Sequence, residues 1–395
     1  MGNDPATVSY ERLRLSEVQR PTEFTFPRQN RYDYTAYLPD TSNLALLPTK
    51  FVRLNLHVMN SQDTLYDFGG PEALEYMRGL LYSSNKKMAD NPENWLKPDS
   101  MEVPALPTRI YFILPDDPDT GRPAYYEHYD DKLYGYVHNG PKRNRSDMAV
   151  IRKYGKRLGE DLNIFFMGPP REMLVNGKSA KRMTDGIYLG DAIKVTDILS
   201  RRIEPWEIRQ VFTHEIGHAL GLNHAWRNDG CPDTPTHANN SWKAADRGPG
   251  LTSNNLMDYS PNQEALTPCQ IGRMQARLND PRSRQRGWAE KTWCDYRADG
   301  QLVIDRDLTI SGGRDYDSDI LVEGGATLTI NARVHLPAGA QIRVAPGATL
   351  RLGPEAILHN DCGDSWGGIT IGDEGRGRRG RVEADPAATL LNEAP

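Results

Sequence analysis

The sequence predicts an α+β fold followed by a β-rich C-terminal module. Three observations support this prediction. Residues 52–58 alternate between apolar and polar side chains, which is typical of a strand. Residues 205–220 have the apolar spacing, the early proline and the early acidic residues of a helix. After about residue 300, short apolar alternations separated by Gly-Ala and Pro-Gly turns replace the helical patterns.

The 395 residues are enough for two or three domains. Residues 1–48 are polar and irregular, and we expect either an activation segment or an arm packed on the next domain. Residues 49–298 are expected to form that domain, with an upper subdomain to about residue 224 and a smaller lower subdomain after it. Residues 299–395 are expected to form the β-rich module.

The upper subdomain is predicted to be a twisted mixed sheet backed by helices. Strands are expected at 52–58, 110–114, 133–137, 162–167 and 186–189, and helices around 74–81 and 148–158. The last strand lies just before the 205–220 helix and is expected at the sheet edge, where an extended peptide can pair with it. The lower subdomain is expected to contain a helix over 268–278.

The most informative motif is HExxHxxGxxH at residues 214–224. His214 and His218 lie four residues apart, on one helical face, where both imidazoles can bind one zinc ion. Glu215 is next to them, placed to contact a zinc-bound water rather than the metal. Gly221 can adopt a left-handed conformation that turns the chain and returns His224 as the third ligand. Three unrelated histidines on an ordinary helix are the alternative, which these fixed positions disfavour.

A second motif, Asn254 to Tyr259, follows the first by some thirty residues. In isolation Met257 and Tyr259 would be expected in core and turn. After the zinc motif they resemble the metzincin pattern, in which a methionine in a tight turn follows the three histidines. The resemblance implies that Met257 forms an apolar floor beneath the histidines and that Tyr259 lies beside the zinc. It also implies the metzincin arrangement, with the sheet and helices above a zinc cleft.

Four segments resemble the pappalysin family, which includes the ulilysin-type peptidases. They are residues 221–226, 231–235, 255–259 and 269–274. The resemblance implies a secreted zinc endopeptidase that acts on proteins or peptides, often with structural calcium near Asp233. Two departures matter: Cys269 lies directly beside Gln270, and the loop between Cys231 and Met257 is short, which weakens the calcium expectation.

The implied reaction is hydrolysis of a peptide bond by a zinc-bound water that Glu215 activates, with Tyr259 helping to stabilise the oxyanion. The alternative function is that of a secreted adhesion or scaffold protein with an inert metallopeptidase-like domain. The intact Glu215 argues against this alternative, because an inert domain has no chemical need for that carboxylate.

All four cysteines follow residue 230, and two disulfides are expected in an oxidising compartment. A Cys231–Cys269 bond would brace the segment after His224 against the segment after Met257, and the pappalysin resemblance points to the same pairing. Cys294 and Cys362 would then tie the catalytic domain to the module. Free thiols are the alternative. The first residues lack a signal peptide, so secretion requires a leader that is absent from this chain.

Composition narrows the list of partners. The formal charge of −5 argues for neither nucleic acid nor an acidic membrane surface as a partner, so no nucleic acid is expected, and no apolar run is long enough to span a membrane. The acidic turn at 116–119 is expected to be a plain turn rather than a calcium site. The sequence does not indicate an oligomeric state.

The C-terminal module contains a near-repeat. Residues 320–330 recur as residues 342–352, and residues 366–371 could begin a further copy. This pattern predicts rungs of a β-solenoid or a small β-roll. A β-sandwich with two similar hairpins remains the alternative, and whether the natural chain continues beyond Pro395 is left open.

Overall fold

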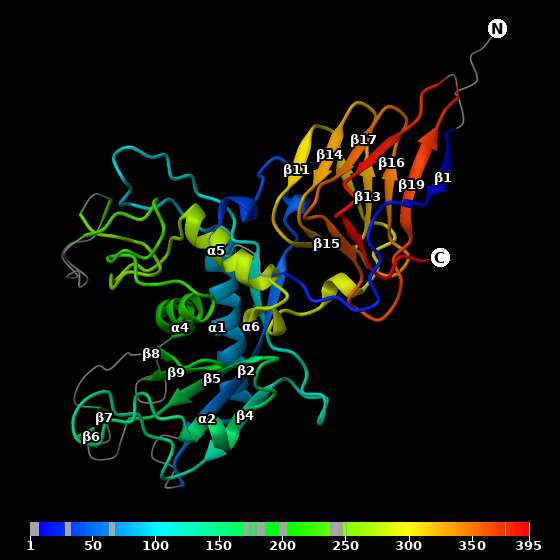
Figure 1. The fold of residues 1–395 in the computed structure, drawn as a ribbon. Helices are drawn as coiled ribbons and strands as arrows, with labels where there is room; N and C mark the ends of the chain where they lie inside the picture. Colours follow the sequence, from blue (N-terminus) through cyan, green and yellow to red (C-terminus); the bar gives the residue numbers. More distant parts are fainter. Residues whose placement is uncertain are drawn as a thin grey trace. The chain divides into compact units, whose positions relative to one another are not determined.

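The computed structural model describes residues 8–27, 33–62, 68–169, 174–175, 178–179, 186–196, 204–237, 248–249, 251–375 and 377–394. The chain divides into two compact units. One consists of residues 49–278 and 283–290, and we call it the motif unit because it contains the histidine motif. The other consists of residues 1–48, 279–282 and 291–395, and we call it the β unit (Figure 1).

A mixed sheet forms the centre of the motif unit. Its order is β3 (Ile110–Ile113), β2 (Lys50–Asn60), β5 (Leu162–Met167), β9 (Ala192–Thr196), β8 (Gly186–Tyr188), and β4 (Tyr125–Tyr129) also pairs with β2. All pairs are parallel except β8 with β9. Strand β5 is buried along its whole length, as expected of a central strand in a sheet covered on both faces. Strand β8 lies at the sheet edge, as predicted from the sequence.

Helices cover both faces of this sheet (Figure 1). On one face, α1 (Gly70–Asp90) packs against α4 (Pro205–Ala219), the helix that carries the histidine motif. Phe166 of β5 stacks on Phe212 of α4 with ring centroids 6.4 Å apart. On the other face, Val150 and Ile151 of α2 (Ala149–Tyr154) join the cluster around Phe165. Adjacent residues of β5 thus point to opposite faces and fix both helix layers.

The structure differs from the sequence prediction at several of the described residues of this unit. Residues 133–137 form turns with a single bridge at Gly135, not a strand, and the strand lies earlier, in β4. Strand β9 was not predicted, because its central Lys194 interrupts the apolar pattern although it is buried. Helix α2 ends at Tyr154, earlier than expected.

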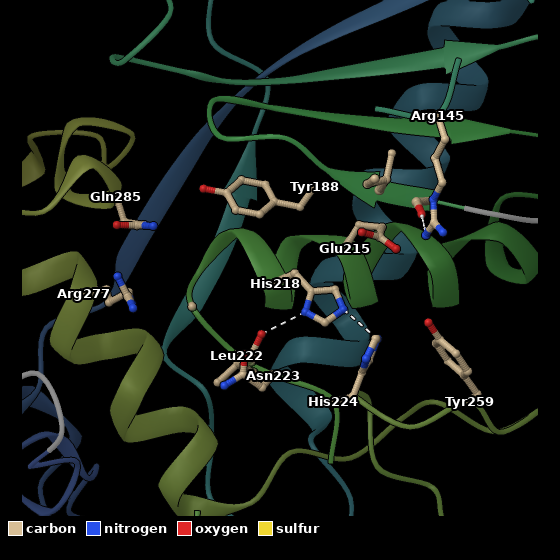
Figure 2. Close-up of a pocket in the computed structure, with 13 residues that line it drawn as sticks. Arg145, Tyr188, Glu215, His218, Leu222, Asn223, His224, Tyr259, Arg277 and Gln285 are labelled. Atoms are coloured by element: carbon tan, nitrogen blue, oxygen red, sulfur yellow. Dashed lines mark hydrogen bonds between the residues drawn. The ribbon is translucent and has the colours of Figure 1, made fainter. Parts of the chain in front are cut away.

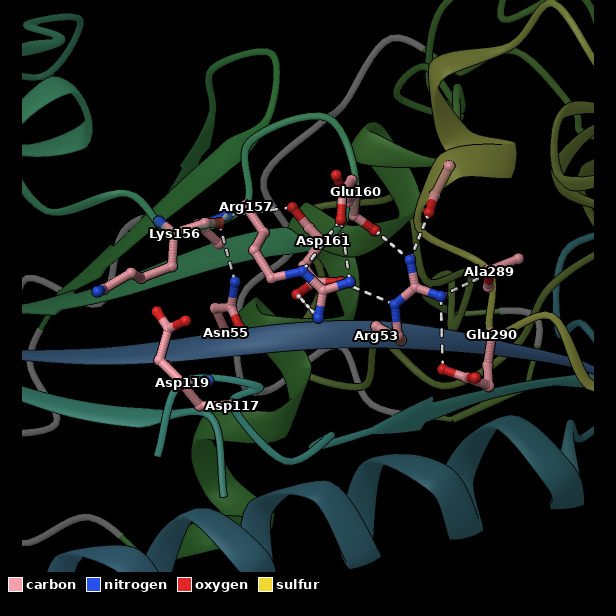
Figure 3. Close-up of polar contacts among 12 residues, drawn as sticks. Arg53, Asn55, Asp117, Asp119, Lys156, Arg157, Glu160, Asp161, Ala289 and Glu290 are labelled. Carbon is pink, nitrogen blue, oxygen red and sulfur yellow. Dashed lines mark hydrogen bonds and ion pairs between the residues drawn. The ribbon is translucent and has the colours of Figure 1, made fainter. Parts of the chain in front are cut away.

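Arg53 connects residues 287–290, the last segment of the motif unit, to the central sheet through hydrogen bonds and ion pairs (Figure 3). It lies on β2, and its guanidinium is buried between β5 and the segment after α6 (Arg284–Gly287). It pairs with Asp161 at 2.7 Å and with Glu290 at 3.4 Å. It also donates to the backbone carbonyls of Glu160, Gly287 and Ala289. A buried guanidinium with this many acceptors is well compensated for its lost hydration.

The β unit is a β-solenoid with three parallel sheets. One sheet contains β10 (Gln301–Ile304), β13 (Asp319–Val322), β16 (Gln341–Val344) and β19 (Gly368–Asp373). The second contains β11 (Leu308–Ile310), β14 (Thr327–Ile330), β17 (Thr349–Leu352) and β20 (Arg381–Ala384). The third contains β12 (Arg314–Asp315), β15 (Arg333–His335), β18 (Ile357–His359) and β21 (Thr389–Leu390).

The near-repeat in the sequence corresponds to stacked rungs. Ile320 pairs with Ile342, and Leu328 pairs with Leu350, so equivalent residues of the two copies are neighbours. Their aliphatic side chains line the interior. Because every sheet pairs its successive rungs in parallel, the β-sandwich alternative is wrong.

The N-terminal residues belong to the β unit. Strand β1 (Ser9–Leu13) pairs antiparallel with β19, and the buried Val18 and Leu46 join the solenoid core. The disulfide Cys294–Cys362 is present, and both of its cysteines lie in the β unit. The bond therefore closes a loop within this unit and does not tie it to the motif unit. Among the helices described, none is both long and apolar enough to cross a membrane.

Candidate active site

The site is built on α4, whose start is defined by local chemistry. Pro205 occupies the first turn, and Glu204 and Glu207 form a reciprocal capping box. These features satisfy backbone N–H groups that would otherwise lack partners at the start of the helix. Phe212 and Ile216 are buried and orient the helix against the sheet. The opposite side of α4 then presents the histidines to a cavity.

The three histidines converge as the motif predicts. His214 and His218 lie one turn apart on α4, and their ring centroids are 4.7 Å apart. Gly221 has a φ of +94° and turns the chain after the helix. His224 then returns so that its Nε2 lies 3.0 Å from Nε2 of His218. The ligand atoms of all three lie within 4.8 Å of one another.

The hydrogen bonds of the Nδ1 atoms determine which ring nitrogens of His214 and His218 face the centre of the histidine group. Nδ1 of His214 lies 2.7 Å from the Leu256 carbonyl, and Nδ1 of His218 lies 2.8 Å from the Leu222 carbonyl. Because a carbonyl can only accept, each Nδ1 carries the proton and each Nε2 keeps its lone pair for a metal. Tetrahedral zinc places its ligand nitrogens about 3.3 Å apart, so this group fits a zinc ion.

Burial keeps these imidazoles neutral. It lowers the pKa of His214 and of His224 to about 3, and the neighbouring His218 adds to both shifts. Burial also lowers the pKa of His218. A neutral imidazole is the form that binds a metal, so no proton has to be displaced at neutral pH.

Met257 packs against α4 at Gly217, between the two helical histidines of the motif. It is fully buried, and its Sδ lies 2.5 Å from the point where residue 217 would carry a Cβ. Only glycine leaves room for this approach. Nearby, the Leu256 carbonyl that holds His214 belongs to the same turn. The turn therefore supports the site both by packing and by a hydrogen bond.

Glu215 lines a cavity of about 460 Å³ next to the histidines. Figure 2 shows its carboxylate directed toward the same space as the His218 and His224 rings. The position of Glu215 depends on Gly186 of the edge strand β8, since a Cβ there would lie 2.4 Å from Glu215 Cγ. The carboxylate is held beside the histidines, which is the position that a general base requires.

Tyr259 is at the open side of this cavity. Its ring centroid lies 4.8 Å from that of His224 and 4.4 Å from that of Trp226. Trp226 in turn stacks on His224 with centroids 4.0 Å apart and planes 15° apart. The Tyr259 side chain is 43% exposed, and Figure 2 shows its hydroxyl directed toward the Glu215 side. The hydroxyl is thus within the cavity rather than in the core.

The Cys231–Cys269 disulfide is present, with Cα atoms 5.5 Å apart. Beside it, the carboxylate of Asp233 accepts hydrogen bonds from the Thr267 hydroxyl at 2.7 Å and the Cys269 N–H at 2.8 Å. Asp233 therefore satisfies one backbone N–H at the start of α5 (Pro268–Asn279). The calcium expectation near Asp233 gains no support from this arrangement.

Several residues that line the cavity could not be predicted from the sequence. Arg145 precedes α2, Tyr188 lies on β8, and Arg277 and Gln285 come from α5 and α6. They come from four segments separated along the chain, and none has motif spacing. Only the tertiary fold brings them to the histidines.

The comparisons with known proteins agree with this geometry. A peptidase family model described as Pregnancy-associated plasma protein-A matches residues 175–279. Over these residues the chain is similar to the pappalysin family of metallopeptidases. The matched segment contains all three histidines, Glu215 and the Met257 turn. No curated protein matches the chain.

Two solved structures resemble part of the chain. Mature mirolysin of Tannerella forsythia in complex with a cleaved peptide is 14% identical, covers 61% of this chain and 95% of its own, and has a TM-score of 0.41. Mirolysin in complex with compound 9 is 15% identical, covers 61% and 96%, and has a TM-score of 0.39. At these values the likeness carries no inference about substrate or mechanism.

Proposed function

We propose that this protein is a zinc-dependent endopeptidase in which His214, His218 and His224 hold the metal and Glu215 is the catalytic base. One observation carries the proposal. The ligand nitrogens of three histidines lie within 4.8 Å of one another, and Glu215 lines the same cavity as His218 and His224. Three protein ligands with an accessible fourth position are typical of catalytic rather than structural zinc.

A bound zinc ion would supply Lewis-acid polarisation of a water molecule and of the scissile carbonyl. Glu215 accepts a proton from that water at a carboxylate oxygen. The same carboxyl group then gives the proton to the leaving amine when the peptide bond breaks. The Tyr259 hydroxyl donates a hydrogen bond to the carbonyl oxygen as negative charge develops there. These roles conserve protons through one cycle and return Glu215 to its ionised form.

The edge strand β8 supports the choice of an endopeptidase. One edge of β8 pairs with β9, and β8 is the last strand of its sheet. Ile187 and Tyr188 of β8 also line the cavity. An extended peptide can therefore add to this edge by main-chain hydrogen bonds and pass through the site without presenting a terminus.

Two substitutions test the proposal. Glu215→Ala is expected to retain about one zinc per chain but to lose peptide hydrolysis by several orders of magnitude. His218→Ala is expected to lose the metal as well. Near-normal cleavage by Glu215→Ala would show that Glu215 is not the base. A wild-type protein that binds zinc but cleaves no peptide in a library would instead favour an adhesion or scaffold function.

We also propose that the protein is secreted. Two disulfides support this, because such bonds persist in oxidising compartments and are rare in the cytosol. Fractionation of the native source, with non-reducing peptide mapping of the recovered protein, tests the proposal. Recovery from the cytosol with four free thiols would contradict it.

A further inference from the structure

The cavity beside the histidines contains a cation that the proposed chemistry does not use. Arg145 lines this cavity together with Glu215 and Tyr259. Figure 2 shows its side chain descending beside the Glu215 carboxylate, on the side of the site where Tyr259 lies. Nη2 of Arg145 donates a hydrogen bond of 3.3 Å to the Gly186 carbonyl on the edge strand β8. The guanidinium is therefore located where a peptide running along β8 would pass.

The backbone around Arg145 accepts hydrogen bonds from the side chain of Lys194. Lys194 of β9 is buried, and its ammonium donates to the carbonyls of Asn144 at 3.1 Å and Arg145 at 3.3 Å, and also to that of Asp147. The Asn144 side chain accepts from Val137 N–H at 2.7 Å. A buried lysine is costly unless its charge is compensated, and here three carbonyls compensate it. These hydrogen bonds connect the backbone at Arg145 to β9, which lowers the ordering cost when the guanidinium binds a ligand.

The charge of the cavity favours an anionic ligand. Among the described residues that line it, Arg145 and Arg277 are the arginines and Glu215 is the carboxylate. The two arginines lie at opposite ends of the cavity in Figure 2. Once the site holds a divalent metal, its positive charge increases further. A basic substrate side chain would meet repulsion at the Arg145 end, whereas a carboxylate would meet a planar donor fork that matches its two oxygens.

We propose that Arg145 is a specificity-determining residue that selects peptides with Asp or Glu beside the scissile bond. This inference rests on the proposed endopeptidase function and specifies its substrate class. The carboxylate accepts hydrogen bonds from the Arg145 guanidinium while the peptide backbone lies along β8. The preference applies to one position, on the Arg145 side of the metal.

Matched peptides test the preference directly. Three series differ only in having Glu, Gln or Lys at one position, and each flanking position of the scissile bond is varied in turn. For the wild-type protein we expect kcat/KM for Glu to exceed that for Gln by about 30-fold at one position, with Lys lower still. Equal rates for Glu and Gln at every position, in a protein that does cleave these peptides, would overturn the role of Arg145.

Substitutions then identify the residue responsible. Arg145→Gln is expected to bring the Glu-to-Gln ratio to within about 3-fold, and Arg145→Glu to reverse the order so that Lys exceeds Glu. Arg145→Lys keeps the charge without the planar fork and should give an intermediate ratio. Arg143→Gln is the matched control, because Arg143 lies in the same loop and is exposed. It removes the same charge and should retain the wild-type ratio.

The zinc bound by each protein is measured together with its activity, so that failure of the proposed function can be distinguished from failure of the Arg145 inference. Each variant is compared at equal bound zinc, so that a damaged fold is not mistaken for lost selectivity. A wild-type protein that binds zinc and cleaves none of the peptides overturns the proposed function and this inference together. Cleavage with a Glu preference that Arg145→Gln and Arg143→Gln reduce equally would leave the endopeptidase intact and overturn Arg145 as the selecting residue.

Discussion

The Sδ atom of Met257 lies 2.5 Å from the position of a Cβ on Gly217, so helix and turn meet where no side chain larger than hydrogen fits. Gly217 lies in the last turn of α4, and glycine is a poorer helix former than alanine. The close approach to Met257 accounts for this unfavourable residue in the helix that carries the histidines.

Gly217→Ala is therefore expected to destabilise the protein although it improves helix propensity. Met257 is fully buried, so displacing its side chain should cost roughly 1–3 kcal/mol in urea unfolding and should lower zinc affinity. The matched control is Gly79→Ala in α1, where the nearest atom to a new Cβ, on Pro205, is 3.3 Å away. Equal stability of the two variants would contradict the steric role of Gly217.

Gly186→Ala tests the proposed role of the Glu215 carboxylate without changing any of the three histidines. The added Cβ would lie 2.4 Å from Cγ and 2.8 Å from Cδ of Glu215, so the carboxylate has to shift. We expect bound zinc to remain near one per chain while kcat falls by about 10- to 100-fold, because base catalysis depends on placement. Steady-state kinetics with metal analysis measures both, and an unchanged kcat would refute the prediction.

Tyr259→Phe tests whether the Tyr259 hydroxyl stabilises the oxyanion or whether the residue only packs against its neighbours. The aromatic ring and its contacts with His224 and Trp226 remain, and only the hydroxyl is lost. If the hydroxyl stabilises the transition state, kcat should fall by about 10- to 100-fold while KM changes little. Wild-type turnover in this variant would assign Tyr259 to packing alone.

His57 should make the metal-free protein sensitive to acid. Burial lowers its pKa to about 3 from an ordinary value of 6.5, with the neighbouring His128 adding to the shift. Between these values the unfolded chain binds a proton and the folded chain does not, so stability falls as pH drops below about 6.5. From pH 6.5 to 5 this single group should cost about 2 kcal/mol.

His57→Phe should weaken that pH dependence. The substitution keeps an aromatic ring against Phe165, whose centroid lies 4.4 Å from that of His57. Asn163 Oδ1, which contacts His57 Nε2, also accepts from the Lys156 N–H at 2.7 Å and so keeps a partner. Urea unfolding with chelator at pH 7.5 and 5 gives the comparison. The same loss of stability in both proteins would show that His57 does not cause it.

The sequence by itself determined the features that depend on local geometry. The spacing of His214, Glu215 and His218 places them on α4 whatever the rest of the chain does, because the helix repeat is fixed. The turn at Gly221 and the return of His224 follow within a few residues. The 22-residue offset between Ile320 and Ile342 likewise indicated stacked rungs, since equivalent residues of a solenoid pair with each other.

The tertiary structure decided which distant segments reach the histidines. Gly186 meets Glu215, and Lys194 holds the loop of Arg145, although each pair is separated by tens of residues. Strand β9 could not be predicted from the sequence because the charged Lys194 interrupts its apolar pattern. Lys194 can be buried there because carbonyls from another segment compensate its charge. Likewise, the N-terminal residues join the β unit through pairing of β1 with β19. Such contacts depend on long-range packing, which local side-chain periodicity does not encode.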